Sequence, residues 1–241
     1  MGLLISQAVW WLPALAIIGI CAMARKYPVD WRFIAAAIGI FAIYSAAVFW
    51  LPQVPFFPQI DGSSHNWTGK IAAIAITLVM IAVTLRTSPS VTRRSLGLTL
   101  VQEEGSLKPA LLATLAMIAF VVSLQAIGGD GKAPSTETLL YQALIPGIDE
   151  ELLFRGLLFG LVAAALAKSG RPALLAGIAV TIVFALGHSF FWSADGPSFD
   201  PVALVYVGVL GSLLMFIRIR TGSLLIPVLA HNLTNVANQL A

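Results

Sequence analysis

The chain has 241 residues, of which 59% are hydrophobic and only 10% are charged, whereas about a quarter of the residues in soluble domains are charged. A soluble fold of this size could not bury so much apolar surface, so the composition predicts one membrane domain over residues 1–241. The net charge of +3 is too small to indicate a nucleic-acid partner. The single cysteine, Cys21, excludes disulfides and cysteine-based metal sites within one chain.

Eight apolar stretches are long enough to cross about 30 Å of hydrocarbon as helices. The expected fold is therefore an all-α, polytopic membrane bundle of about eight transmembrane helices, in which segment 139–241 carries the polar motifs. The predicted helices are 3–24, 33–51, 70–86, 109–128, 139–167, 172–191, 201–217 and 224–240.

Lysine and arginine concentrate in alternate predicted loops. If the N-terminus lies outside, the outer loops hold only Lys70 and Lys132, and the inner loops hold eleven basic residues: Arg25, Lys26, Arg32, Arg86, Arg93, Arg94, Lys108, Lys168, Arg171, Arg218 and Arg220. Because inner loops are enriched in basic residues, this bias predicts that both termini lie outside.

A block of ionisable residues lies about halfway along the fifth predicted helix, where 149–155 reads Asp-Glu-Glu-Leu-Leu-Phe-Arg. Each such group costs about 3 kcal/mol in mid-membrane and is retained mainly for function. Glu151 and Arg155 share a helix face, which favours a structural ion pair. Glu150 lies about 100° around the helix and has no local positive partner, which suits a general base. Asp149 is expected to cap a helical turn.

Each of two later predicted helices places a histidine one helical turn from a second residue of interest. Phe184 precedes His188 by four positions, and His231 precedes Asn235 by four positions. A lone buried histidine is more often structural, but two on separate helices, together with the paired glutamates, favour a shared site. The third histidine, His65, is expected at the surface of an outer loop.

The predicted depths of these groups do not agree. Glu150 and His231 fall near the middle of their helices, whereas His188 falls near the outer end of its own. At 1.5 Å per residue the offset is on the order of 10 Å. A shifted or tilted sixth helix, or a cavity that opens toward one face, would remove the conflict.

Together these groups can hydrolyse an amide bond without a nucleophilic Ser or Cys. Glu150 and His188 can deprotonate a water molecule and later protonate an amine leaving group. His231 and Asn235 can donate hydrogen bonds to a developing oxyanion.

The same segments resemble the CPBP family, the CAAX protease and bacteriocin-processing (Abi) membrane proteins. That family carries E-E-x-x-x-R, then F-x-x-x-H, then H-x-x-x-N or a close variant. All three blocks occur here in order on separate predicted helices, over about the last 100 residues: Glu150-Glu151-Leu152-Leu153-Phe154-Arg155, Phe184-Ala185-Leu186-Gly187-His188 and His231-Asn232-Leu233-Thr234-Asn235.

The resemblance implies an eight-helix fold like that of the Ras-converting CAAX endopeptidase and an intramembrane glutamic endopeptidase, and the residues themselves favour a mechanism without a metal cofactor. It implies that Glu150 and His188 activate water and that His231 and Asn235 form the oxyanion hole. The supporting roles fall to Glu151, Arg155 and Phe184. The implied substrate is a peptide or lipidated protein, and the implied location is a prokaryotic cell membrane.

Three other functions remain open from the residues alone. Two glutamates and two histidines could bind zinc, although no H-E-x-x-H is present and asparagine is a poor zinc ligand. Intramembrane Glu, His and Arg also build proton pathways in transporters, although no internal repeat is visible. A non-catalytic immunity protein could bind a peptide in the same cavity.

Overall fold

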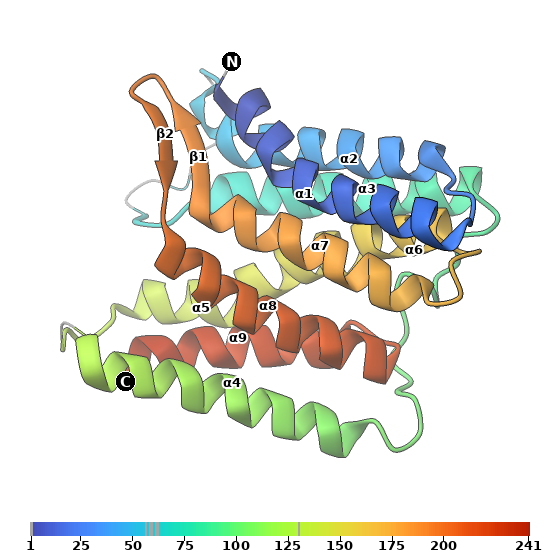
Figure 1. Ribbon diagram of the computed structural model, residues 1–241. Helices are drawn as coiled ribbons and strands as arrows, with labels where there is room; N and C mark the ends of the chain where they lie inside the picture. Colours follow the sequence, from blue (N-terminus) through green and yellow to red (C-terminus); the bar gives the residue numbers. More distant parts are fainter. Residues whose placement is uncertain (1, 56, 58–59, 61–62, 130) are drawn as a thin grey trace.

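Eight helical segments run along one common direction and pack side by side (Figure 1). The computed structural model describes residues 2–55, 57, 60, 63–129 and 131–241. The bounds are α1 Gly2–Arg25, α2 Trp31–Phe49, α3 Trp67–Thr87, α4 Leu107–Gly128, α5 Thr136–Glu150, the π-helix η2 Glu151–Leu158, α6 Phe159–Ala165, α7 Pro172–Ser189, α8 Pro201–Thr221 and α9 Leu225–Leu240. A 3-10 turn, η1 Leu51–Gln53, follows α2. Since α5, η2 and α6 are continuous, they correspond to the one helix predicted over 139–167, and the all-α prediction is confirmed.

The helices begin where the sequence supplies capping side chains. Asp30, Asn66, Ser135 and Asp200 each accept a hydrogen bond from a backbone N–H in the first turn of α2, α3, α5 and α8. The αL residue Gly222, with φ of 70°, ends α8. These caps fix where α3 and α5 enter the bundle, which matters for the site below.

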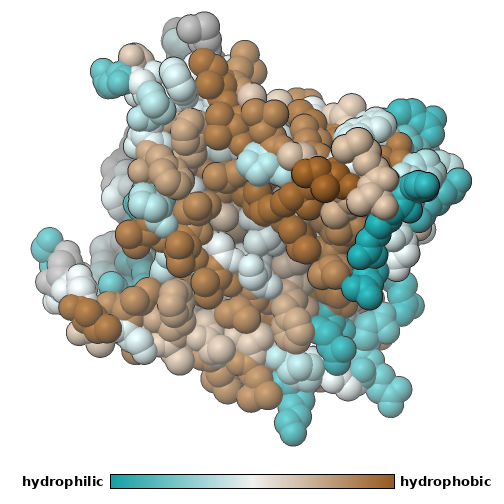
Figure 2. Space-filling model, in the orientation of Figure 1, coloured by the Kyte–Doolittle hydropathy of each residue, from teal (hydrophilic) through white to brown (hydrophobic). Residues whose placement is uncertain are grey.

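Six of the described helices are long and apolar enough to cross a membrane: α1, α2, α3, α4, α7 and α8. The exposed surface around the middle of the bundle is correspondingly apolar (Figure 2). The other two segments, α5–η2–α6 and α9, carry the first and third motifs and pack among the rest, and the second motif lies at the end of α7. The chain is thus a multi-pass integral membrane protein.

The two ends of the bundle differ in charge. Loops 26–30, 88–106, 166–171 and 222–224 lie at one end, which is the hydrophilic edge on the right of Figure 2. The start of α1 and the end of α9 lie at the opposite end (Figure 1). The basic residues that were predicted to face inward therefore gather at a single end of the molecule.

A short hairpin that the sequence analysis missed follows α7. The predicted helix 172–191 ends at Ser189, and strands β1 Phe190–Ser193 and β2 Gly196–Phe199 pair antiparallel. Gly196 has a φ of 103°, which favours glycine in the turn. The hairpin is fixed to α1, since Trp10 Nε1 donates to the Phe190 carbonyl at 2.7 Å and the Ser6 hydroxyl accepts from the Trp192 N–H at 2.7 Å.

The arrangement of helices brings the motif segments together. α5 packs on α9, and α7 packs between α1 and α8. An aromatic cluster of Trp10, Phe41, Phe154 and Phe184 fills the space between α1, α2, η2 and α7. The polar residues of the three motif segments meet beside this aromatic cluster.

Candidate active site

The backbone changes form where the motif begins. Pro146 lies inside α5 and has no N–H to donate. The N–H of the next residue, Gly147, donates to the side-chain oxygen Oδ1 of Asn232 in α9 at 2.8 Å. Directly after Glu150 the chain passes into the π-helix 151–158, a form that is rare and frequent at functional sites. Helix α5 is therefore anchored to α9 one turn before the glutamate pair.

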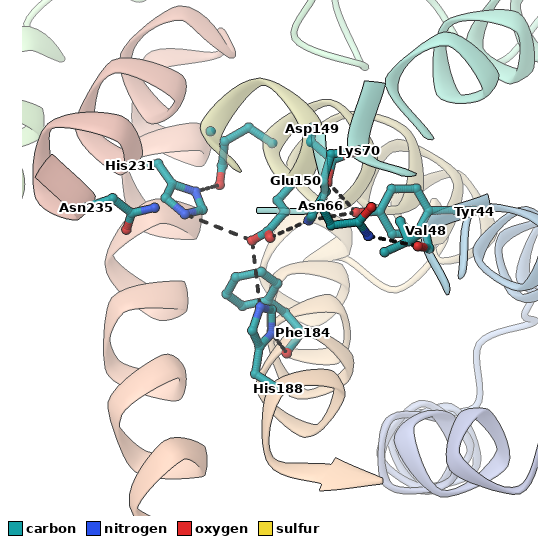
Figure 3. Close-up of polar contacts among 12 residues, drawn as sticks. Tyr44, Val48, Asn66, Lys70, Asp149, Glu150, Phe184, His188, His231 and Asn235 are labelled. Atoms are coloured by element: carbon teal, nitrogen blue, oxygen red, sulfur yellow. Dashed lines mark hydrogen bonds and ion pairs between the residues drawn. The ribbon is translucent and has the colours of Figure 1, made fainter. Parts of the chain in front are cut away.

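Glu150 has a cationic partner, contrary to the sequence prediction. Lys70 Nζ of α3 lies 2.9 Å from Glu150 Oε1 (Figure 3). The sequence predicts Lys70 in an outer loop, but it stands one turn after the α3 cap Asn66 and its side chain is only 15% exposed. The premise that Glu150 stands unpaired is wrong, because its partner comes from a distant helix.

Asp149 does not cap a helix but completes this ion-pair cluster. Its Oδ2 atom accepts from Lys70 Nζ at 2.6 Å and from the Tyr44 hydroxyl of α2 at 2.5 Å. Asp149 is fully buried and lies within α5. The expected capping role is therefore wrong, since a buried carboxylate at this position needs a cation and a hydrogen-bond donor.

Both motif imidazoles face the remaining oxygen of Glu150. Nε2 of His188 lies 3.8 Å from Glu150 Oε2, and Nε2 of His231 lies 3.9 Å from the same atom (Figure 3). The predicted depth offset is absent, because α7 ends at Ser189 and the hairpin carries the chain onward. The Phe184 carbonyl can only accept, so His188 Nδ1 donates to it at 2.8 Å and Nε2 is left toward Glu150.

The second glutamate holds the other imidazole. Glu151 Oε1 pairs with Arg155 at 2.9 Å and with His231 Nδ1 at 2.8 Å, and Glu151 and Arg155 have no exposed side-chain surface. Arg155 also donates to the Gly211 carbonyl and lies 4.2 Å above the ring of Phe184. The predicted Glu151–Arg155 pair forms, and it links the π-helix to α7, α8 and α9.

A cavity of about 330 Å³ opens beside Glu150, His188 and His231. One wall is largely apolar and comes mainly from α8, with Met117 from α4. The other is polar and consists of Gln142, Thr234, Asn235, Asn238 and Gln239. Asn235 Nδ2 donates to Gln142 Oε1 at 3.1 Å. All four predicted catalytic residues thus border one cavity, with Asn235 half-buried and beside His231 (Figure 3).

A second cavity, of about 380 Å³, lies on the other side of the same polar cluster. Lys70, Glu150 and His188 border both cavities. Its remaining wall is mainly aromatic and aliphatic and includes Trp10, Phe41, Phe49, Phe154 and Phe191. The polar cluster therefore stands between a mixed cavity and an apolar one.

The zinc alternative fits these side chains poorly. Within the part of the chain that the structure describes, no three His, Cys, Asp or Glu side chains are arranged to hold a metal ion. The ammonium of Lys70 would also repel a dication placed on Glu150. The arrangement suits proton transfer more closely than metal ligation.

Four partners of the site escaped the sequence analysis: Lys70, Tyr44, Gln142 and Asn232. A weak signal existed for Lys70, since it is a lone cation at the edge of an apolar segment in a chain whose motif has an excess of acids. Asn232 stands inside the third motif, and Pro146 signals a break in the backbone hydrogen bonds of α5 nearby. Tyr44 and Gln142 give no signal, because their roles follow from helix packing.

Most residues of the polar cluster and of the first cavity lie within a segment that matches a known protein family, whereas most residues that line the second cavity precede that segment. Residues 133–237 match the family described as type II CAAX prenyl endopeptidase Rce1-like. Comparisons with curated proteins and with solved structures give no match. The resemblance that the three motifs indicated is confirmed: residues 133–237 are an Rce1-like domain of the type II CAAX prenyl endopeptidase family, which is a family of proteases.

Proposed function

We propose that this protein is an intramembrane endopeptidase that uses Glu150 to activate the attacking water. The observation that carries the proposal is the position of Glu150 Oε2, which faces Nε2 of both His188 and His231 at the wall of a cavity. A general base must lie within reach of the water that it deprotonates, and this oxygen is available because Lys70 binds the other one.

In the proposed reaction, water binds between Glu150 and His188 and attacks the carbonyl carbon of the scissile bond. Glu150 takes a proton from the water as the C–O bond forms. The negative charge on the carbonyl oxygen receives hydrogen bonds from His231 Nε2–H and Asn235 Nδ2–H. Glu150 then gives its proton to the amide nitrogen, the C–N bond breaks, and an amine and a carboxylic acid leave.

Glu151 fixes the imidazole ring of His231 for this role. The contact of 2.8 Å between His231 Nδ1 and Glu151 Oε1 directs Nε2 toward the cavity. Glu151 and Arg155 are then supporting residues, and Phe184 fixes both Arg155 and His188 from one side.

The two cavities suggest a substrate of mixed polarity. The amide-rich wall of Gln142, Asn235 and Asn238 suits a peptide backbone, because amides both donate and accept hydrogen bonds. The aromatic cavity on the other side of Glu150 suits a prenyl group or another large apolar group. A prenylated or otherwise membrane-associated peptide would place its scissile bond between them.

We further propose that the site opens on the outer face of the membrane. The mixed cavity extends to Asn238 and Gln239 near the end of α9, at the end of the bundle away from the basic loops (Figure 1). If those loops face the cytoplasm, both termini and the cavity mouth face outward.

A cysteine scan tests this orientation. In a Cys21→Ser background, Gln239→Cys should react with a membrane-impermeant maleimide in intact cells, and Lys168→Cys should react only after permeabilisation. The reverse pattern would place the site on the cytoplasmic side.

The experiment that tests the hydrolase proposal compares membranes that contain wild-type protein with membranes that contain Glu150→Gln protein. Quantitative mapping of peptide ends should find at least one new terminus that depends on Glu150 and also disappears in His188→Ala. Lys168→Gln, at the opposite end of the bundle, serves as the matched control. Identical peptide ends with and without Glu150 would remove the proposal.

A chelator separates the proposed metal-free mechanism from the zinc alternative. Under the proposed mechanism, cleavage by purified wild-type protein should persist in the presence of a strong chelator and should not rise when zinc is added. Loss of cleavage with the chelator and recovery with zinc would favour the metalloprotease instead.

A further inference from the structure

The pairing of Lys70 with two adjacent carboxylates implies a role that the three sequence motifs do not include. We propose that Lys70 is a positioning residue that keeps Glu150 ionised and turns its Oε2 atom to the imidazoles. Asp149 and Tyr44 hold Lys70 in place. This inference rests on the proposed hydrolase function, since it describes how the general base is prepared.

The two carboxylate oxygens of Glu150 have different partners. Oε1 lies 2.9 Å from Lys70 Nζ, and Oε2 faces Nε2 of His188 and His231. A carboxylate that is bound through one oxygen cannot rotate freely, so the other oxygen stays directed into the cavity (Figure 3). Pre-orientation of this kind is what a general base requires.

Lys70 is itself fixed by residues on the side of the cluster away from the imidazoles. Asp149 Oδ2 accepts from Lys70 Nζ at 2.6 Å, and the Tyr44 hydroxyl donates to that same oxygen at 2.5 Å. The ammonium is therefore bound on two sides, by the buried carboxylate of Asp149 and by the general base. Asp149 and Tyr44 act on Glu150 through Lys70.

The charge balance around Glu150 explains why a cation is needed here. The titratable and charged groups that face it or its immediate partners come from six elements: Tyr44 of α2, Lys70 of α3, Tyr141 and Asp149 of α5, Glu151 and Arg155 of η2, His188 of α7 and His231 of α9. Three carboxylates stand against two permanent cations among these described residues. Without Lys70, both Asp149 and Glu150 would lose the cation that pairs with them.

Removal of Lys70 should therefore protonate Glu150. An excess charge in an enclosed site is costly, and uptake of a proton is the least costly way to remove it. A protonated Glu150 cannot accept a proton from water, so activity at neutral pH would be lost although the general base is still present. Higher pH would restore it.

The activity test uses three variants with opposite expected effects. Lys70→Met should lower kcat/KM at least about tenfold at pH 7 and move the acid limb of the pH profile upward by about one to three pH units. Asp149→Asn should move the acid limb downward. Lys70→Met with Asp149→Asn removes one charge of each sign, so its acid limb should lie between these two and the fold should be kept.

A second readout does not depend on proteolysis. Infrared difference spectra of purified protein in lipid, with Glu150→Gln as the reference, report whether Glu150 carries a proton. At pH 7 the protonated-carboxyl band should be absent from wild type, present in Lys70→Met and weaker in the double variant. If wild-type protein cleaves nothing, the hydrolase proposal fails, and this band still decides the role of Lys70.

The inference is overturned if Glu150 remains ionised in Lys70→Met at pH 7 and the acid limb of the pH profile does not move, whether or not activity falls. A fall in activity with an unmoved profile would mean that Lys70 only stabilises the packing of α3 against α5.

Discussion

Gly147 lies directly against Asn232, and its N–H donates to the Asn232 side chain at 2.8 Å. A Cβ atom at position 147 would stand 2.5 Å from Asn232 Oδ1 and 2.7 Å from the Val228 carbonyl. Only glycine allows α5 and α9 to approach this closely, and the contact lies one turn from Glu150. Helix contact and site geometry are therefore set by the same residue.

Gly147→Ala should separate α5 from α9 and move Glu150 away from His231. Overpacking of this kind costs about 1–3 kcal/mol, and we expect a loss of cleavage as well. The matched control is Gly39→Ala in α2, where an added Cβ meets no atom within 4 Å. Reversible unfolding in detergent and cleavage rates measure both effects. Equal unfolding stability and equal cleavage rates for the two variants would show that the close approach of α5 to α9 at Gly147 does not determine the site geometry.

Arg155→Met should destabilise the protein more than any change at the exposed surface. It leaves Glu151 buried without its cation, and breaking a buried pair from one side costs about 3–5 kcal/mol. Arg155→Met combined with Glu151→Gln should recover much of this loss, because no charge is left unpaired and the new amide oxygen can still accept from His231. A double variant no more stable than Arg155→Met would argue against a paired charge here.

The contacts of Glu137 predict an acid-sensitive interaction at the end of the bundle that holds the start of α1 and the end of α9. The backbone N–H and hydroxyl of Ser64 and the indole of Trp67 donate to this carboxylate, and they lower its pKa from 4.5 to about 2. Because the folded pKa is the lower one, the stabilisation is complete above pH 4.5 and is lost as the pH falls toward 2.

Hydrogen exchange at the backbone amide of Ser64 and at the indole N–H of Trp67 should therefore rise on acidification across this range. Glu137→Gln should show the faster exchange already at neutral pH. Exchange that does not change with pH in wild-type protein would contradict this role for Glu137.

Much of the architecture could be predicted because lipid imposes simple rules on sequence. Eight apolar stretches gave eight helical segments with bounds close to the observed ones, and basic loops gathered at one end. The hairpin 190–199 was missed because Phe190 and Phe191 extend the apolar run of α7. Apolar content cannot distinguish a helix from a strand that packs against α1.

The site was predictable only in part. The motifs placed Glu150, His188, His231 and Asn235 on three segments, and all four border one cavity. The partners of Glu150 and Asp149 could not be read in the same way, because Lys70 and Tyr44 lie on helices α3 and α2, far away in the sequence. Local spacing reveals pairs within one helix, such as Glu151 and Arg155, and not pairs between helices.

The most direct test is hydrolysis in water enriched in oxygen-18. Purified wild-type protein, reconstituted in lipid with a peptide that shows a Glu150-dependent cleavage, should place one heavy oxygen in the new carboxyl group in a single turnover. Glu150→Gln should yield no labelled product while it unfolds at the same denaturant concentration as wild type. Labelled product from Glu150→Gln at the wild-type rate would contradict the assignment of Glu150 as the base that activates water.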